Sequence, residues 1–115
     1  MLRDEAYLLD MLVAARRATQ HAAGLEREQF ESSLLHQDAI MRELQIIGEA
    51  ANEVSQGTRA EHSYIDWNGI IGLRHRLVHG YRKIRRYVVW HVVKNEVPLL
   101  IQQLEQIVLP EQPEP

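Results

Sequence analysis

The 115-residue chain has no cysteine, which excludes a disulfide scaffold, a thiol nucleophile and a zinc site built from thiolates. It also lacks a run of about 18 uncharged apolar residues, so we expect no segment that crosses a membrane. The N-terminal residues do not follow the basic-then-apolar pattern of a secretion signal. With 45% hydrophobic and 25% charged residues, the composition is that of a globular protein. We therefore expect one soluble, cytoplasmic domain.

Acidic residues are missing from one long stretch, residues 67–95, which is rich in positive charge. This basic block holds seven of the 13 positive residues, so six remain against all 16 acidic residues elsewhere, a balance of −10. The seven are Arg74, Arg76, Arg82, Lys83, Arg85, Arg86 and Lys94. A basic block in an acidic chain favours an anionic partner such as a phosphate group. A solvated basic face whose charge complements acidic helices elsewhere explains the charges equally well, and both interpretations stay open.

Apolar residues recur at spacings of three and four along most of the chain, which is typical of amphipathic helices. The first helix is expected over about residues 3–23, and a second, long one over about residues 27–55. Gly48 interrupts the second helix and indicates a place where another helix crosses closely. After a polar connection, Asp66 is expected to cap a third, shorter helix that ends at Gly80 or just before it.

The last helix is expected over about residues 86–109. Val88–Val93 could instead form a strand, since β-branched residues favour sheets, but a lone strand would have no partner here. Pro98 is expected to kink or restart this helix because proline lacks a backbone N–H. Residues 110–115 contain only proline, glutamate and glutamine and are expected to be a disordered tail. The sequence thus predicts an all-α domain over residues 1–109, an antiparallel bundle of four to five helices.

The basic block contains a candidate catalytic pair, Arg74 and His79. Five positions rotate an ideal helix by about 140°, so these side chains would not share a face. If the helix ends near Leu77, a turn at Gly80 can bring the two side chains together. Histidine titrates near neutral pH and can move a proton from a ribose 2′-hydroxyl, while arginine holds the phosphate. Such a pair could cleave a phosphodiester without a metal ion.

Two other interpretations of the same residues have to be weighed. His75 and His79 are one helical turn apart, a spacing at which two imidazoles can bind zinc. A third ligand is missing nearby, since the block has no acidic residue and the chain no cysteine, so we expect neither a metal nor a cofactor. An arginine and a histidine near a helix end are also often structural, and the residue pattern alone leaves that alternative open.

Arg74, His79 and Tyr81 form the pattern Arg-x4-His-x-Tyr, and with it the chain resembles the HEPN superfamily, specifically its HepT-type toxins. Further blocks occur in the order that the family has. They are Ile46–Ala50, Asp66–Trp67 followed by Ile70–Arg74, Val78–Tyr81, and Val89–Trp90 leading to Val97–Leu99. Several blocks in register are far more specific than one short motif.

The resemblance implies a helical bundle that forms a homodimer and joins two Arg-x4–6-His motifs in one cleft. It implies a metal-independent endoribonuclease toxin in which Arg74 binds the scissile phosphate of RNA and His79 is the catalytic acid or base. It also implies a partner, an MNT-type nucleotidyltransferase antitoxin that transfers AMP to Tyr81 and so blocks the site. Glu49 matches a family glutamate, for which we expect a structural or network role.

The residues around the motif are expected to bind substrate, and they are His75, Arg76, Arg82 and Lys83. The family most often has asparagine where this chain has His75, so the role of that histidine is open. One alternative function is a non-catalytic subunit that binds nucleotide or RNA for a minimal nucleotidyltransferase. Another is a helical dimerisation partner whose basic loop docks an acidic protein. An intact pair of Arg74 and His79 favours the enzyme, because binding alone would not require the histidine.

Overall fold

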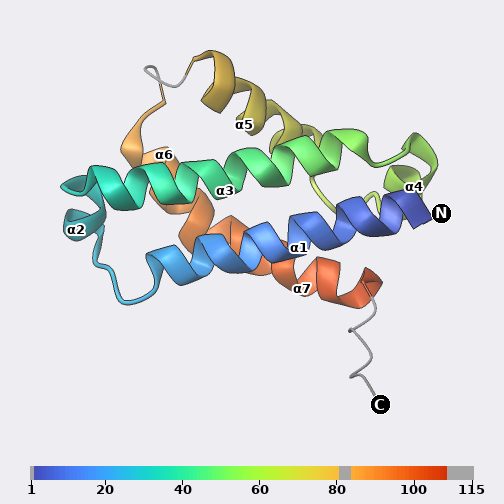
Figure 1. The fold of residues 1–115 in the computed structure, drawn as a ribbon, viewed down its shortest axis with the longest axis horizontal. Coiled ribbons are helices and arrows are strands. Elements are labelled where there is room, and N and C mark those ends of the chain that lie inside the picture. Colours follow the sequence, from blue (N-terminus) through green and yellow to red (C-terminus); the bar gives the residue numbers. More distant parts are fainter. Residues whose placement is uncertain (1, 81–83, 109–115) are drawn as a thin grey trace.

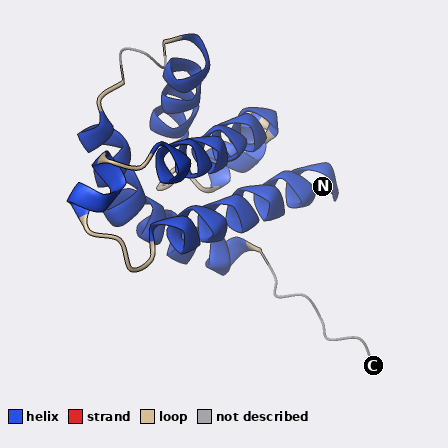
Figure 2. Ribbon diagram, turned by 60° about the vertical axis from the view of Figure 1, so that its left-hand side comes forward, coloured by secondary structure: helices blue, strands red, loops and turns tan. Residues whose placement is uncertain are grey.

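The computed structural model describes residues 2–80 and 84–108, and every regular element in these residues is a helix (Figures 1 and 2). The elements are α1 (Leu2–Ala22), α2 (Arg27–Glu31), α3 (Leu34–Glu53), α4 (Gln56–Glu61), α5 (Trp67–His79), α6 (Arg86–His91), the π-helical turn η2 (Val92–Glu96) and α7 (Val97–Ile107). Since α6, η2 and α7 are continuous, four long segments and the two short helices α2 and α4 make up the described chain. The predicted all-α fold is confirmed.

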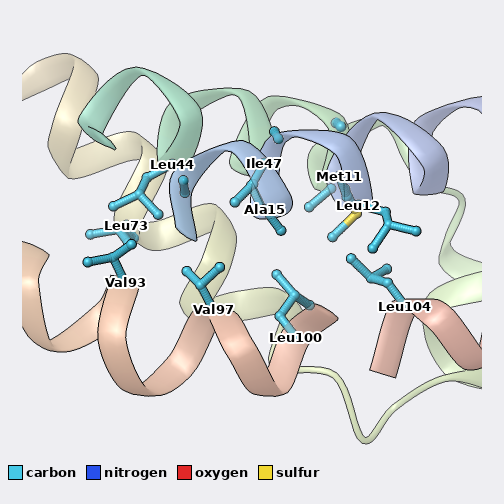
Figure 3. Packing of buried hydrophobic residues seen from close by; sticks show 14 of the residues in the cluster. Met11, Leu12, Ala15, Leu44, Ile47, Leu73, Val93, Val97, Leu100 and Leu104 are labelled. Carbon is cyan, nitrogen blue, oxygen red and sulfur yellow. The ribbon is translucent and has the colours of Figure 1, made fainter. Parts of the chain in front are cut away.

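The long segments run in alternating directions, and the core lies where α1, α3 and α7 meet (Figures 1 and 3). Small side chains line the buried face of α1, and they allow α3 to approach closely. These residues are Ala14, Ala15, Ala18 and Ala22. Met11 from α1 and Leu104 from α7 are fully buried. No helix among the described residues is long and apolar enough to cross a membrane.

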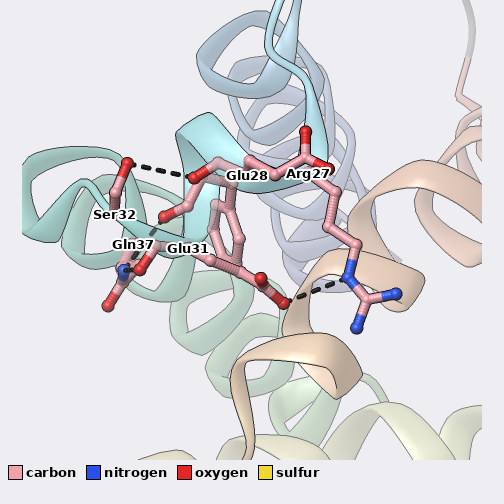
Figure 4. Close-up of polar contacts among 6 residues, drawn as sticks. Arg27, Glu28, Glu31, Ser32 and Gln37 are labelled. Atoms are coloured by element: carbon pink, nitrogen blue, oxygen red, sulfur yellow. Dashed lines mark hydrogen bonds and ion pairs between the residues drawn. The ribbon is translucent and has the colours of Figure 1, made fainter.

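The single helix predicted over residues 27–55 is wrong, because the chain breaks between α2 and α3. The Ser33 hydroxyl accepts a hydrogen bond from the backbone N–H of His36 at 3.2 Å and so caps the start of α3. Gln37 then reaches back, and its Nε2 donates to the carbonyl oxygens of Phe30 at 2.9 Å and Glu31 at 3.1 Å (Figure 4). Side-chain hydrogen bonds thus satisfy the backbone groups that a continuous helix would have paired.

The polar connection expected after α3 also contains a helix, the six-residue α4. Ser55 caps it and is held by Asp4 near the start of α1. The Asp4 carboxylate accepts hydrogen bonds from the Ser55 hydroxyl at 2.6 Å, the Thr58 hydroxyl at 2.6 Å and the Ser55 backbone N–H at 3.0 Å. These bonds, first of all that of the Ser55 side chain, lower the pKa of Asp4 from 3.8 to about 2. The α4 segment is therefore anchored to α1.

The ends of α5 and the start of α7 follow the sequence predictions. Asp66 Oδ1 accepts a hydrogen bond from the backbone N–H of Gly69 at 3.0 Å, which confirms Asp66 as the cap of α5. Gly80 lies at the C-terminal end of α5, as predicted. Val88–Val93 are helical, and Pro98 lies in the first turn of α7, directly after the π-helical turn η2. The expected tail, residues 110–115, lies outside the described residues.

Candidate active site on helix α5

Helix α5 packs directly against α3, and Gly48 makes this close approach possible. A Cβ atom placed on Gly48 would collide with the Cβ of Arg74 and would lie 3.2 Å from the carbonyl oxygen of Ile70. The prediction that another helix crosses at Gly48 is therefore confirmed. Because the β-carbon of Arg74 packs against the backbone of α3, the base of this side chain is held in a fixed position.

The guanidinium of Arg74 is partly buried and faces a carboxylate. Its Nε is buried and has no hydrogen-bond partner in the described part of the chain, so the terminal nitrogens are the groups that can meet a ligand. Nη2 lies 3.8 Å from Oε1 of Glu49 on α3, which is an ion pair but too long for a hydrogen bond. The two side chains are 33% and 44% exposed, so this pair remains accessible to solvent.

His79 is exposed on another side of α5 and does not approach Arg74. The helix does not end near Leu77, the condition under which the two side chains could meet. It continues through His79 and keeps them about 140° apart. No hydrogen bond or ion pair joins this pair, both members of which lie in the described part of the chain. One chain therefore presents the arginine and the histidine separately.

His79 instead lies beside His75, one helical turn earlier. The two rings are tilted by 47° and their centroids are 4.6 Å apart, and both side chains are exposed. Among the described residues, no group of three or more His, Cys, Asp or Glu side chains could hold a metal ion. The pair thus forms an accessible imidazole surface at the end of α5.

Arg76, another predicted substrate-binding residue, does not join this surface. Arg76 is exposed on a further side of α5, about 200° from Arg74, where it lines an apolar cavity of about 340 Å³. That cavity lies between α5 and the η2–α7 segment, and its wall includes Tyr64 and Glu96. Tyr81, Arg82 and Lys83 lie outside the described residues.

A groove of about 370 Å³ lies between α3 and the C-terminal half of α5, and the sequence analysis did not single it out. Its lining residues are Asp38, Met41, Arg42, Gln45, Leu77 and Val78. On α3, Leu34 and Leu35 precede these residues and are 71% and 76% exposed. The sequence shows the adjacent leucines, but their exposure depends on how the helices pack, so no sequence signal marked this face. We refer to the groove and the two leucines as the α3–α5 face.

The family model described as Ribonuclease HepT-like matches residues 11–107. The chain belongs to this family. The match covers α3 and α5 entirely, so Glu49, Arg74 and His79 all lie within the HepT-like region. The resemblance to HepT-type proteins of the HEPN superfamily is thereby confirmed.

Proteins from several organisms are similar to this HepT-like chain over most of their lengths. One from Methanocaldococcus jannaschii, named as an inferred RNase, is 29% identical over 101 residues, or 88% of this chain and 93% of that protein. One from Caldanaerobacter subterraneus subsp. tengcongensis, similarly named, is 30% identical over 88% of this chain and 90% of that protein. One from Thermococcus cleftensis, named as an inferred ribonuclease HepT, is 29% identical over 101 residues, which are 88% of this chain and 92% of that protein. No solved structure matches the chain.

Proposed function

We propose that this HepT-like chain is a metal-independent endoribonuclease that uses Arg74 and His79. The observation that carries the proposal is that the family match spans a helix on which this arginine and histidine are both accessible. The names of the relatives, which refer to RNases, support RNA as the substrate. The two side chains are accessible, Arg74 at 33% exposure and His79 on the exposed end of α5, so both can reach a substrate.

The reaction that fits these groups is attack by the ribose 2′-hydroxyl on the adjacent phosphate. His79 takes the proton of the hydroxyl, and the 2′-oxygen forms a bond to phosphorus while the bond to the 5′-oxygen breaks. The leaving 5′-oxygen takes a proton from a second, protonated histidine. Arg74 stabilises the negative charge that builds on the phosphate oxygens. The products are a 2′,3′-cyclic phosphate and a 5′-hydroxyl.

A homodimer is part of this proposal, because one chain keeps Arg74 and His79 on different sides of α5. A twofold axis near α5 would place the histidine of one copy beside the arginine of the other and would supply the second histidine. The α3–α5 face suits such an interface, since it has exposed leucines and opposite charges four residues apart, Asp38 and Arg42. In a twofold interface each of these charges can meet its opposite on the second copy.

We further propose that the enzyme is a cytoplasmic toxin controlled by an MNT-type nucleotidyltransferase antitoxin. Tyr81 follows His79 by two positions, so AMP attached to its hydroxyl would lie near the catalytic histidine. The added bulk and negative charge would compete with the RNA phosphate for arginine. The support for this part is the Arg-x4-His-x-Tyr pattern and membership of the HepT-like family.

The deciding experiment is RNA cleavage by purified protein in excess chelator. The His79→Ala variant is expected to lose cleavage, while His91→Ala, an exposed histidine on α6, should keep it. Cyclic-phosphate ends on the products of the native protein would support the mechanism. Equal cleavage by native protein and His79→Ala would show that a contaminant or another residue is responsible.

The alternative is a non-catalytic subunit that binds nucleotide or RNA for a nucleotidyltransferase. The observation in its favour is that Arg74 and His79 do not meet within one chain, since a binding surface would not need them to. This alternative gains support if intact, unmodified native protein binds RNA without cleaving it.

A further inference from the structure

Glu49 is placed to act on the phosphate-binding arginine rather than on RNA directly. Its Oε1 lies 3.8 Å from Nη2 of Arg74, at the accessible end of the contact between α3 and α5. Glu49 is the residue next to Gly48, whose backbone supports the β- and γ-carbons of Arg74. Two successive residues of α3 therefore contact the two ends of the arginine side chain.

The arginine has few other constraints on its orientation. Its Nε is buried and has no hydrogen-bond partner among residues 2–80 and 84–108, so none of these residues fixes the guanidinium plane through that atom. Gly48 limits where the stem lies but contributes no hydrogen-bonding group. The negative charge of Glu49 is therefore the feature that favours an orientation with the terminal nitrogens directed towards solvent.

We propose that Glu49 is a positioning residue for Arg74, an inference that rests on the proposed ribonuclease function. In the free enzyme its carboxylate holds the guanidinium at the position that the scissile phosphate needs. Because this contact is long and half-exposed, a phosphate can form closer, charge-assisted hydrogen bonds to the same nitrogens. The carboxylate then remains near the bound phosphate as a like charge, so Glu49 weakens binding while it aligns the catalytic complex.

This dual effect gives Glu49→Gln an unusual kinetic signature. Loss of the negative charge should lower KM by roughly two- to fivefold, the size expected for exposed charge interactions. Loss of alignment should lower kcat by roughly ten- to a hundredfold, since small displacements of a catalytic group have effects of this size. Glu49→Asp keeps the charge on a shorter side chain, so its KM should stay near the native value while kcat falls.

The experiment measures kcat and KM for RNA cleavage by the native protein, Glu49→Gln and Glu49→Asp, with Glu53→Gln as the control. Glu53 is exposed one turn further along α3 and should be replaceable without effect on either constant. A fall in both kcat and KM for Glu49→Gln, with an unchanged unfolding midpoint, would support positioning. A fall in kcat with an unchanged or raised KM and a lowered unfolding midpoint would overturn it in favour of a structural role.

Two further measurements exclude other roles and separate this inference from the proposed function. The pH–rate profile of Glu49→Gln should keep both limbs, because loss of a limb would make Glu49 a proton-transfer group and overturn positioning.

Binding of a 2′-O-methyl oligonucleotide, which lacks the attacking hydroxyl, tests the arginine without cleavage. If native protein cleaves no RNA, the ribonuclease proposal fails, whereas tighter oligonucleotide binding by Glu49→Gln would still support the action on Arg74. Equal binding by native protein and Glu49→Gln would overturn it.

Discussion

At the scale of single residues, the candidate site depends on Gly48, a residue without a side chain. Gly48 allows the stem of Arg74 to lie on the backbone of α3, and this contact sets where the guanidinium emerges. A glycine inside a helix costs roughly 1 kcal/mol relative to alanine. The close crossing of α3 and α5 gives this cost a clear structural reason.

Replacement of Gly48 by alanine should therefore destabilise the protein although it improves helix propensity. The new methyl group would collide with the Cβ of Arg74, an atom that cannot move without the helix, so we expect a loss of roughly 1–3 kcal/mol. Urea unfolding measures this loss, and Gly72→Ala on α5 is the matched control. A Cβ at Gly72 meets nothing within 4 Å, so that variant should be neutral or slightly more stable. Equal stability of the two variants would contradict the close-contact explanation.

The sequence proposed Arg74 and His79 as site residues, but it could not show how they face one another. The spacing of Arg74 and His79 already indicated different faces of a helix, and the structure agrees. Because α5 continues to Gly80, the earlier helix end near Leu77 that would have let the two side chains meet does not occur. The contact between Glu49 and Arg74 joins residues 25 positions apart, and no local pattern specifies such a contact.

At the scale of elements, short polar side chains decide where helices begin and end. The break between α2 and α3 and the helix α4 both depend on serine caps, at Ser33 and Ser55. Serines after an apolar repeat are a readable signal for such breaks. The partners that make the caps effective are harder to predict, since Asp4 comes from the far end of the chain.

The link between Asp4 and α4 should make stability sensitive to acid. The folded-state pKa of Asp4 is lowered from 3.8 to about 2, so its contribution is fully present above about pH 4. That contribution is lost as the pH falls through about 2, because a protonated carboxyl accepts these hydrogen bonds poorly. Compared with native protein, Asp4→Asn should be less stable at neutral pH, and the difference should shrink below about pH 3.

Urea unfolding at several pH values tests this expectation for Asp4. Asp10→Asn is a suitable control, since Asp10 is exposed on the same helix, α1. Its difference from native protein should stay small at every pH. A difference for Asp4→Asn that stays constant between neutral pH and about pH 2 would show that the hydrogen bonds do not depend on the ionised carboxylate.

At the scale of the whole molecule, the proposed interface and the candidate site share two helices. The α3–α5 face carries the exposed Leu34 and Leu35, and the same two helices carry Glu49, Arg74 and His79. The sequence predicted the all-α bundle because helix periodicity is local and strong. It could not locate the surface for a second copy, because exposure of single leucines depends on how the helices pack.

The proposed dimer can be tested by placing a charge on the α3–α5 face. Leu35 is 76% exposed, so Leu35→Glu should leave the fold stable but place two like charges near a twofold axis. Sedimentation analysis should show a shift from dimer to monomer, and RNA cleavage should fall with it. Leu99→Glu is the control, because Leu99 is 55% exposed on α7, away from this face. An unchanged sedimentation profile for Leu35→Glu would exclude this face as the interface.

The π-helical turn η2 has a consequence for the phase of the last helical segment. Buried Val89, Val93 and Val97 are spaced by four residues, and in a regular α-helix each such step drifts about 40° around the axis. The wider π-helical turn winds more slowly and cancels much of this drift, so these valines and Leu100 can stay on one seam. The π-helical turn thus changes the pitch of the helix locally. The helix keeps its buried face towards the bundle without a break in the chain.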